Sequence, residues 1–222
     1  MLFDFADLAP RDRYKLMAST ILPRPIAWVV TESPEGRRNA APFSFFNMFS
    51  DDPPVVCLGI GARAGDPKDT ARNIRETGQF VVNLVSEAVA ERMNVTAIEF
   101  GPEVDELAEA GLETAPSVKV RPPRIACSPV ALECERMTIL ELGPSRSLVV
   151  GQVLAMHIHD DAVLDAAKCY VDTPKLGLVA RMHGRGWYAR STDLFDMPRI
   201  DVADWRERHP AQDAVENHSH SD

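Results

Sequence analysis

The sequence predicts a mainly β protein, an antiparallel β-barrel with a few added helices. Strand-like segments outnumber helical ones, and the two kinds do not alternate as they do in a parallel α/β fold. Two long β-rich segments, 130–142 and 147–159, are separated only by a short turn at Gly143-Pro144, as expected for a hairpin. The 222 residues suffice for one sizeable core and show neither repeat nor linker, so we expect a single domain over residues 1–222.

The first 85 residues contain four expected strands and two expected helices, of which the second is at 66–78. Residues 11–20 have the pattern of a short amphipathic helix, which ends before Pro23. The apolar segments that follow are bounded by Pro, Gly and Asp, as strands usually are. We expect strands at 25–31, 39–50, 55–60 and 80–85, the second of them rich in Phe and Ser.

Residues 66–78 are the most informative segment, because they predict a short helix with well-defined ends. Asp66 can cap this helix, and Pro67 suits its first position, where no backbone donor is lost. Asp69, three residues past the expected cap, resembles the acid of a capping box, and Gly78 can close the far end. Such caps are common, so the segment alone favours an ordinary surface helix.

The surroundings of this helix favour a phosphate site at its start. Lys68 and Thr70 add a cation and a hydroxyl to the first turn, where free amides and the helix dipole already favour an anion. The helix lies between two expected strands, and glycines end the first of them, which gives a plausible phosphate-holding unit. It is neither a Walker A loop nor a dinucleotide fingerprint, because the glycine patterns of both are absent.

The second half of the chain returns to strands after an irregular region. Residues 99–123 hold four prolines and predict an irregular excursion. Gly151, in the middle of the long segment 147–159, indicates a bulge or a close contact. We also expect helices at 87–97, 104–110 and 161–170, a last strand region at 178–190 broken by Gly184 and Gly186, and a polar tail from Asp193 that is partly ordered at best beyond Trp205.

The composition argues against several classes of function. The apolar share of 45% and the charged share of 26% are those of an ordinary globular protein. The net charge of −9 argues against a general nucleic-acid-binding or membrane-surface protein. The N-terminal residues do not have the pattern of a secretory signal, and no uncharged apolar run is long enough to span a bilayer.

Cysteine usage indicates a reducing compartment. None of the four cysteines forms a Cys-x-x-Cys motif. Cys57 and Cys134 lie within apolar or alternating strands, where cysteine usually acts as a small hydrophobe. We therefore expect a cytoplasmic protein, with a redox dithiol as the weaker alternative.

Several motifs follow one another in a specific order. They are Leu22-Pro-Arg-Pro-Ile-Ala-Trp-Val-Val-Thr31, Asn39-Ala-Ala-Pro-Phe-Ser-Phe-Phe-Asn47, Ser50-Asp-Asp-Pro-Pro54, Lys68-Asp-Thr-Ala-Arg-Asn-Ile-Arg-Glu-Thr-Gly78 and Phe80-Val-Val-Asn83. In this order they resemble the flavin reductase-like family of FMN-binding split-barrel proteins, over roughly residues 12–195. The resemblance implies a homodimer of six-stranded split barrels with two FMN sites at the subunit interface.

The resemblance also implies that residues 42–47 border the flavin ring. Ser44 and Asn47 could hydrogen-bond the ring edge or the ribityl chain, and Phe45 could border the ring itself. Alternatively, the phenylalanines are core residues and Ser44 is an ordinary strand hydroxyl, because successive strand residues face opposite ways. Asn83 is a candidate cofactor-binding residue only because it belongs to the motif Phe80-Val-Val-Asn83.

The FMN phosphate is expected at the start of the 66–78 helix. The residues near it are Arg63, Lys68, Asp69 and Thr70. Because Asp69 is an acid, we expect it to cap the helix or fix the loop and not to contact the phosphate.

Residues 178–190 resemble the family's C-terminal segment near the flavin. Arg181, His183 and Tyr188 are candidates to approach the ring or the phosphate, from the partner subunit in a dimer. Arg181 and His183 are also the candidates to orient an incoming nucleotide, although no residue is a certain catalytic one, since the flavin carries the chemistry. The alternative is a solvated basic loop.

A metal site is not expected. His157 and His159 are spaced to share one strand face, and Asp160 and Asp161 follow them. Two imidazoles so spaced can bind a metal, but a third ligand at a defined place is missing, so a strand end that meets solvent is the better interpretation.

The leading hypothesis is an FMN-dependent oxidoreductase of the flavin reductase kind. NADH or NADPH would pass a hydride to the flavin, which would then reduce oxygen, free flavin or a partner monooxygenase. One alternative is a non-catalytic FMN-binding electron carrier of the same fold. Another is a structural dimer without cofactor, against which the intact 66–78 motif argues.

Overall fold

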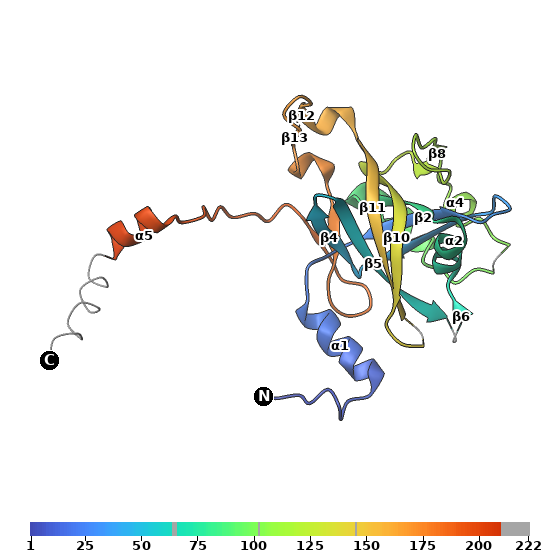
Figure 1. Ribbon diagram of the computed structural model, residues 1–222, viewed down its shortest axis with the longest axis horizontal. Helices are drawn as coiled ribbons and strands as arrows, with labels where there is room; N and C mark the ends of the chain where they lie inside the picture. Colours follow the sequence, from blue (N-terminus) through green and yellow to red (C-terminus); the bar gives the residue numbers. More distant parts are fainter. Residues whose placement is uncertain (64–65, 102, 145, 210–222) are drawn as a thin grey trace. The chain divides into compact units, whose positions relative to one another are not determined.

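The computed structural model describes residues 1–63, 66–101, 103–144 and 146–209 (Figure 1). It consists of two units, Met1–Thr192 and a C-terminal unit that begins at Asp193. The second unit contains the helix α5 (Val202–Arg208), which the sequence analysis did not predict. The end of the expected tail, residues 210–222, lies outside the described residues.

The first unit is mainly β, as predicted. Its helices are α1 (Pro10–Thr20), α2 (Asp69–Thr77), α3 (Ala90–Val95) and α4 (Glu106–Glu109), with short 3-10 helices at Glu87–Val89, Asp160–Ala162 and Pro174–Leu176. Its strands are β1 (Arg24–Pro25), β2 (Ala27–Glu32), β3 (Arg38–Phe43), β4 (Phe46–Asp51), β5 (Pro54–Arg63), β6 (Asp66–Pro67), β7 (Gln79–Leu84), β8 (Thr114–Ala115), β9 (Arg124–Ile125), β10 (Val130–Glu141), β11 (Arg146–Ile158), β12 (Val163–Asp165), β13 (Tyr170–Val171), β14 (Val179–Arg181) and β15 (Tyr188–Arg190). Among the described residues, no helix is long and apolar enough to cross a membrane.

The main sheet curls into a barrel. Its strand order is β3-β2-β7-β10-β11-β5-β4, with β6 added beside β5, and its neighbouring strands are antiparallel. The two end strands, β3 and β4, follow each other in sequence across Ser44-Phe45, and the Gly59 amide donates to the Phe45 carbonyl at 2.7 Å. This junction brings β3 beside β5 and closes the barrel.

Within the described residues this sheet has eight strands, two more than the six that the resemblance implied. The expected strand 39–50 breaks at Ser44-Phe45 and gives both β3 and β4. The other additional strand is β6, which pairs with the end of β5. The predicted hairpin of β10 and β11 is confirmed, with Val130 opposite Ile158 and Glu141 opposite Ser147.

Two apolar cores explain why the central strands are continuously hydrophobic. Along β2, Ala27 and Val29 face the barrel interior, whereas Trp28 and Val30 face an outer core beneath α3, α4 and residues 112–127. Both faces are buried, so the strand need not alternate with polar residues. The Trp28 indole donates to Thr96 Oγ1 at 2.9 Å, which satisfies its one polar group inside the outer core.

Helix α2 closes one end of the barrel (Figure 1). Ala71 and Ile74 are buried in the interior core. Gly78 ends the helix as predicted, in the left-handed conformation at φ 74°, and its amide donates to the Ile74 carbonyl. The Gly78 carbonyl accepts from the Arg136 amide at 2.7 Å, which ties the end of the helix to β10.

Gly151 is required for packing, in agreement with the prediction of a close contact or bulge. A Cβ at this position would lie 2.4 Å from Cζ of the buried Phe80 ring. Gly151 also pairs with Arg136, next to a register shift between β10 and β11. The absence of a side chain therefore lets two strands approach the ring.

The prediction of a helix at 161–170 is wrong. Residues 160–162 form one 3-10 turn, and the chain then makes the small hairpin of β12 and β13. Cys169 has a positive φ of 57°, which ends any helical path just before Tyr170 pairs with Asp165. The helix predicted at 11–20 is confirmed as α1, and the remaining predicted helices are present, although shorter or partly 3-10.

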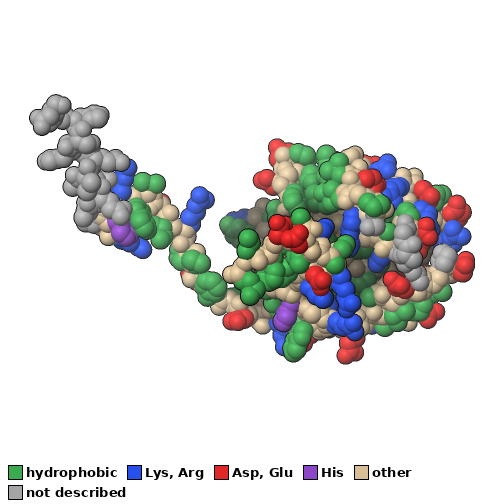
Figure 2. All heavy atoms as spheres, turned by 90° about the horizontal axis from the view of Figure 1, so that it is seen from below, with side chains coloured by type: hydrophobic (Ala, Val, Ile, Leu, Met, Phe, Trp, Pro, Cys, Tyr) green, Lys and Arg blue, Asp and Glu red, His purple; other side chains and the backbone are tan. Residues whose placement is uncertain are grey.

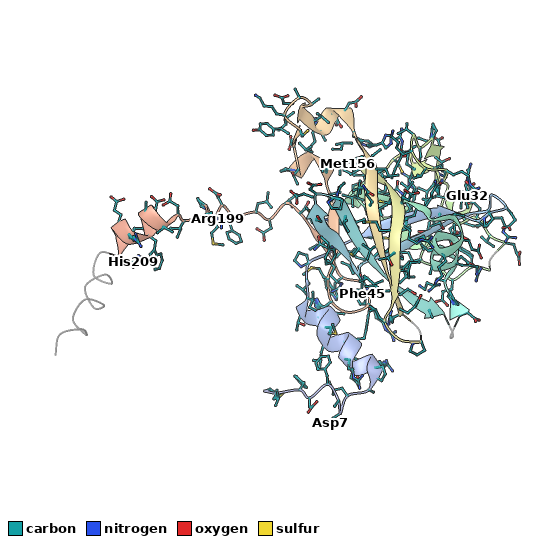
Figure 3. All side chains as sticks on the ribbon, viewed as in Figure 1. Asp7, Glu32, Phe45, Met156, Arg199 and His209 are labelled. Carbon is teal, nitrogen blue, oxygen red and sulfur yellow. The ribbon has the colours of Figure 1, made fainter. Side chains whose placement is uncertain are left out.

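Several large apolar side chains remain exposed on the barrel. Met48 and Phe49 lie on β4, Leu140 on β10, and Leu154 and Met156 on β11. Figure 3 marks Met156 near the end of β11, and Figure 2 shows how hydrophobic side chains gather at the surface beside Lys and Arg. An apolar surface of this kind favours contact with another protein surface.

Candidate functional site

A cavity of about 380 Å³ opens at the start of α2. One wall is β3, with Asn39, Ala41 and Pro42, and another is the segment 96–100. The first residues of α2 and the β6 strand before it form the rest. This volume is in the range of small-molecule sites, and it lies where the sequence predicted a phosphate.

The start of α2 differs from the prediction in a way that leaves its amides available. Asp66 does not cap the helix and Pro67 is not its first residue, because both belong to β6 and pair with Ala62 and Arg63. The helix begins at Asp69 after Lys68, which has an extended conformation and makes no side-chain cap. The first-turn amides therefore have no side-chain cap, and Lys68, Asp69 and Thr70, which begin the helix, line the cavity.

Lys68 and Thr70, two of the residues expected near the phosphate, both line this cavity. Lys68 forms no ion pair with any residue that the structure describes, and its ammonium lies 5.7 Å from the centre of the Phe43 ring. Thr70 is 1% exposed, and its hydroxyl accepts from the Asn39 side-chain amide at 2.9 Å. The structure thus pairs Thr70 with Asn39, a residue of the motif that had not been considered as a contact.

Asp69 and Arg63 complete the predicted phosphate set. The Asp69 carboxylate pairs with the Arg72 guanidinium at 2.6 Å within the first turns of α2. The carboxylate of Asp69 is therefore engaged within its own helix, and it neither caps the helix nor is shown to fix a loop. The Arg63 side chain lies outside the described part of the structure.

Residues 44–47 do not line the same cavity. Phe45 lies between the barrel and α1 (Figure 3), 42% exposed, with its ring 6.3 Å from that of Tyr14. The exposed Asn47 uses its side-chain oxygen to accept from the Met48 amide. These side chains form a second, more open surface next to β3.

Arg24 connects this surface to the C-terminal hairpin. Its guanidinium donates to the carbonyls of Ala18 and Ile21 in α1, to the Met182 carbonyl at 2.9 Å and to Ser44 Oγ at 3.4 Å. The sequence analysis missed Arg24 as a structural centre. The only signal was an arginine between two prolines, and its partners lie up to 158 residues away.

The loop 182–187 contains one of the three C-terminal candidates, His183, and is flanked by the other two, Arg181 at the end of β14 and Tyr188 at the start of β15. Arg181 donates to the carbonyls of Gly184 and Trp187 and lies over the Tyr188 ring, 4.9 Å from its centre. His183 stacks on Trp187, with ring centres 6.1 Å apart. The loop is therefore held by its own contacts, and through Arg24 it is connected to Ser44.

Asn83 is a core residue, which corrects its assignment to the cofactor. It is fully buried, its amide nitrogen donates to the Trp28 carbonyl, and its oxygen accepts from the Ile125 amide. Both ends of the amide are engaged in joining β7 to β2 and β9. The motif placed it correctly in a strand, but the amide has no position from which to reach a ligand.

Glu106 is a second residue that the sequence did not single out. It begins α4, is 8% exposed, and accepts from the Ala40 amide at 3.1 Å. It also lines the cavity at the start of α2. Burial, together with the charges of Asp69 and Asp105, raises the pKa of the Glu106 carboxyl above its ordinary value.

At the end of β11, His159 and Asp160 are exposed, as expected for a strand end that meets solvent, whereas the His157 side chain is only 26% exposed. Its Nε2 lies 2.6 Å from the carboxylate of Glu133, which is 0% exposed. The same carboxylate accepts from the amides of Val118, Lys119 and Val120. Burial alone would raise the pKa of Glu133, but these hydrogen bonds outweigh it and lower the pKa. Among the described residues, no group of three or more His, Cys, Asp or Glu side chains could hold a metal ion.

Comparison with known proteins identifies the family. Residues 17–173 match the flavin reductase like domain. The chain belongs to this family. A relative in Deinococcus radiodurans, described as an uncharacterized protein, is 43% identical over 216 residues, which are 95% of each chain.

Solved structures agree with this assignment. The 2-nitrobenzoate 2-nitroreductase NbaA of Pseudomonas fluorescens is 33% identical, with a TM-score of 0.83 over 91% of this chain and 98% of that one. Component B of the nitrilotriacetate monooxygenase of Bacillus cereus is 29% identical, with a TM-score of 0.84 over 89% of this chain and 98% of that one. The family resemblance and the split-barrel fold inferred from the sequence are therefore confirmed, and the family supports a flavin-related redox function.

Proposed function

We propose that this protein is an FMN-dependent oxidoreductase, an NAD(P)H-linked flavin reductase. The observation that carries the proposal is the cavity at the start of α2 in a flavin reductase-like chain. It combines amides without a side-chain cap, the ammonium of Lys68 and a volume suited to part of a nucleotide. In this proposal Lys68 and the first-turn amides hold the phosphate, and Asn39 fixes the Thr70 hydroxyl beside it.

FMN is proposed as the flavin because the motifs of this chain resemble those of FMN-binding split-barrel proteins. A second cavity, of about 160 Å³, shares Asn39, Asp69, Arg72 and Glu106 with the first. In its lining, Arg37 is paired with Glu35 and Arg72 with Asp69.

The C-terminal hairpin supplies the groups that could orient a reduced nicotinamide. A bound flavin accepts a hydride from such a donor and passes the electrons on, so the protein needs chiefly to position the two rings. Arg181 and His183 lie on a loop connected to Ser44 through Arg24. Arg181→Ala should therefore slow reduction by NADH or NADPH more than it weakens FMN.

We further propose a homodimer with FMN at the subunit interface. The exposed apolar residues of β4, β10 and β11 provide the surface that would be buried. Sedimentation at micromolar concentration should give twice the mass of the 24.5 kDa chain. A monomer that retains FMN fully would contradict the dimer.

The acceptor of the electrons is proposed from similarity. Component B of the Bacillus cereus nitrilotriacetate monooxygenase supports a partner oxygenase, with oxygen and free flavin as the other acceptors. The four cysteines, all in described parts of the chain, are free, which fits a reducing cytoplasm.

Two measurements on the purified protein test this function. After addition of FMN and desalting, the protein should keep about one flavin per chain by absorbance. Anaerobic mixing with NADH or NADPH should then bleach the flavin, and oxygen should restore it. Failure to retain FMN would refute the cofactor. Retained FMN that dithionite reduces but neither nucleotide does would indicate the electron-carrier alternative.

A further inference from the structure

Glu106 is a buried acid at the junction of two cavities. Its carboxylate accepts from the Ala40 amide, and the residue lines both the cavity at the start of α2 and the adjoining polar one. Asn39, Asp69 and Arg72 also line both cavities. A carboxylate here is within the same enclosure as the Lys68 ammonium and the first-turn amides. An acid is an unexpected residue type beside a site suited to an anion.

The charged groups around Glu106 come from several elements. Asp69 and Arg72 face it from α2, and they are paired with each other at 2.6 Å. Asp105 precedes it and caps α4, and Arg38 lines the adjoining cavity from β3. Asp66, Lys68 and Glu99 line the larger cavity, and Glu35, Arg37 and Glu76 the smaller one. Burial disfavours a negative charge on Glu106, and so do the negative charges of Asp69 and Asp105.

We propose that Glu106 couples phosphate binding at this site to the uptake of a proton. The inference rests on the proposed function, because it takes the ligand to be the phosphate end of FMN. A neutral Glu106 leaves Lys68 and the amides free to attract the phosphate. An ionised Glu106 places a negative charge, of the same sign as the phosphate, in the same cavity as the ligand.

The direction of the pH dependence follows from this coupling. Glu106 is protonated below its pKa in the free protein, so affinity for FMN is highest there and falls as the pH rises through that value. By linkage, bound phosphate raises the pKa of Glu106. The acid dissociation constant of Glu106 falls by the same factor by which ionisation of Glu106 lowers the affinity for the phosphate. A tenfold change in affinity corresponds to a shift of about one pKa unit.

Riboflavin and a matched variant separate this effect from others. Riboflavin lacks the phosphate, so its affinity reports the ring site alone. The phosphate itself titrates near pH 6, an effect that any variant retains. Glu106→Gln keeps an oxygen that can accept from the Ala40 amide but cannot ionise. Glu109→Gln, on the exposed side of the same helix, is the control.

The experiment measures dissociation constants of FMN and riboflavin between pH 5 and 9 by quenching of flavin fluorescence. For the unaltered protein and Glu109→Gln, the FMN-to-riboflavin affinity ratio should fall about tenfold or more as the pH rises. In Glu106→Gln this fall should be absent, which leaves only the titration of the phosphate itself, and that favours binding at higher pH because the Lys68 ammonium attracts the dianion more strongly. The same pH profile in Glu106→Gln and the unaltered protein would overturn the inference and leave the proposed function intact.

A measurement on the unaltered protein does not depend on the folding of the variant. Calorimetry in buffers of different ionisation enthalpy gives the number of protons taken up when FMN binds. Above about pH 7.5 the phosphate is already a dianion, so uptake there must come from the protein. Uptake with FMN but not with riboflavin supports the role of Glu106. No proton uptake at any pH from 5 to 9 would refute it, and absence of FMN binding over that range would remove the proposed function as well.

Discussion

Replacing Glu133 by Gln should destabilise the protein severely, although the two side chains have nearly the same shape. The Glu133 carboxylate is buried on the outer face of β10 and accepts from the amides of three successive residues, Val118 to Val120. It also contacts His157 Nε2 at 2.6 Å. A single carboxylate thus fixes the irregular loop before β9 to two strands of the barrel.

The magnitude follows from the number of donors around the carboxylate. A glutamine oxygen can keep at most two of the four contacts, and its NH₂ group would face donors and not acceptors. Hydrogen bonds to a charged group contribute roughly 1.5–3 kcal/mol each, so the loss of two amounts to about 3–6 kcal/mol. Partial movement of the loop would relieve some of this cost. We therefore expect Glu133→Gln to lower the free energy of unfolding by at least about 3 kcal/mol.

Urea unfolding at pH 7, followed by tryptophan fluorescence, measures this difference. Glu135→Gln is the matched control, since Glu135 lies two residues further along the same strand and is exposed. The control should change the free energy of unfolding by less than about 0.5 kcal/mol. If Glu133→Gln also lost under 1 kcal/mol, the carboxylate would not be what holds the loop, and the hydrogen-bond assignment would be wrong.

The stability difference between the unaltered protein and Glu133→Gln should also depend on pH, in a direction that follows from the pKa of Glu133. Because the folded-state pKa of Glu133 is lowered, its stabilising contribution is fully present above the pKa of the unfolded chain. The contribution is lost as the pH falls from about 4.5 through the lower folded value. The stability difference between the unaltered protein and Glu133→Gln should therefore narrow in acid. A difference that widened below pH 4.5 would contradict the lowered pKa.

Two further substitutions test the site and the packing. Lys68→Ala should weaken FMN about tenfold or more and leave riboflavin nearly unchanged, because only FMN carries the phosphate that the ammonium would contact; equal losses for both ligands, measured by fluorescence titration, would exclude the helix start as the phosphate site. Gly151→Ala should lower stability by about 1–3 kcal/mol, because the new Cβ would overlap the buried Phe80 ring. Gly101→Ala, where the space is open, should leave the melting temperature nearly unchanged, and similar melting of both variants would show that the ring can move aside.

The sequence predicted the barrel well because its strands are defined by local patterns. The run 26–30 is apolar along its whole length since it is buried on both faces, and the β10–β11 hairpin is long enough to be recognised without its neighbours. The segment 161–170 was predicted wrongly for the opposite reason. Its Ala, Leu and Lys residues favour a helix, but the pairing of Tyr170 with Asp165 overrides this weak local preference.

For the candidate site too, the sequence predicted only those features that have a local pattern. Lys68 and Thr70 became candidates because a helix start carries a local signature, although the pairing of Asp66 and Pro67 with β5 moved the start by two residues. Glu106 and Arg24 had no such signature. Each is a charged residue whose burial depends on partners far away in sequence, such as Ala40 for Glu106, 66 residues distant. A single sequence offers no means of distinguishing such an acid from an exposed one.

Arg24 has a consequence for the order in which the protein can acquire its structure during synthesis. The guanidinium joins carbonyls of α1 to the Met182 carbonyl, so the N-terminal helix gains its last anchor only when the C-terminal hairpin exists. Barrel strands from β2 to β11 can pair before that point, since they lie between the two. A ribosome-bound chain that stops before residue 182 should therefore contain a nearly complete barrel whose first helix is still exposed to proteases.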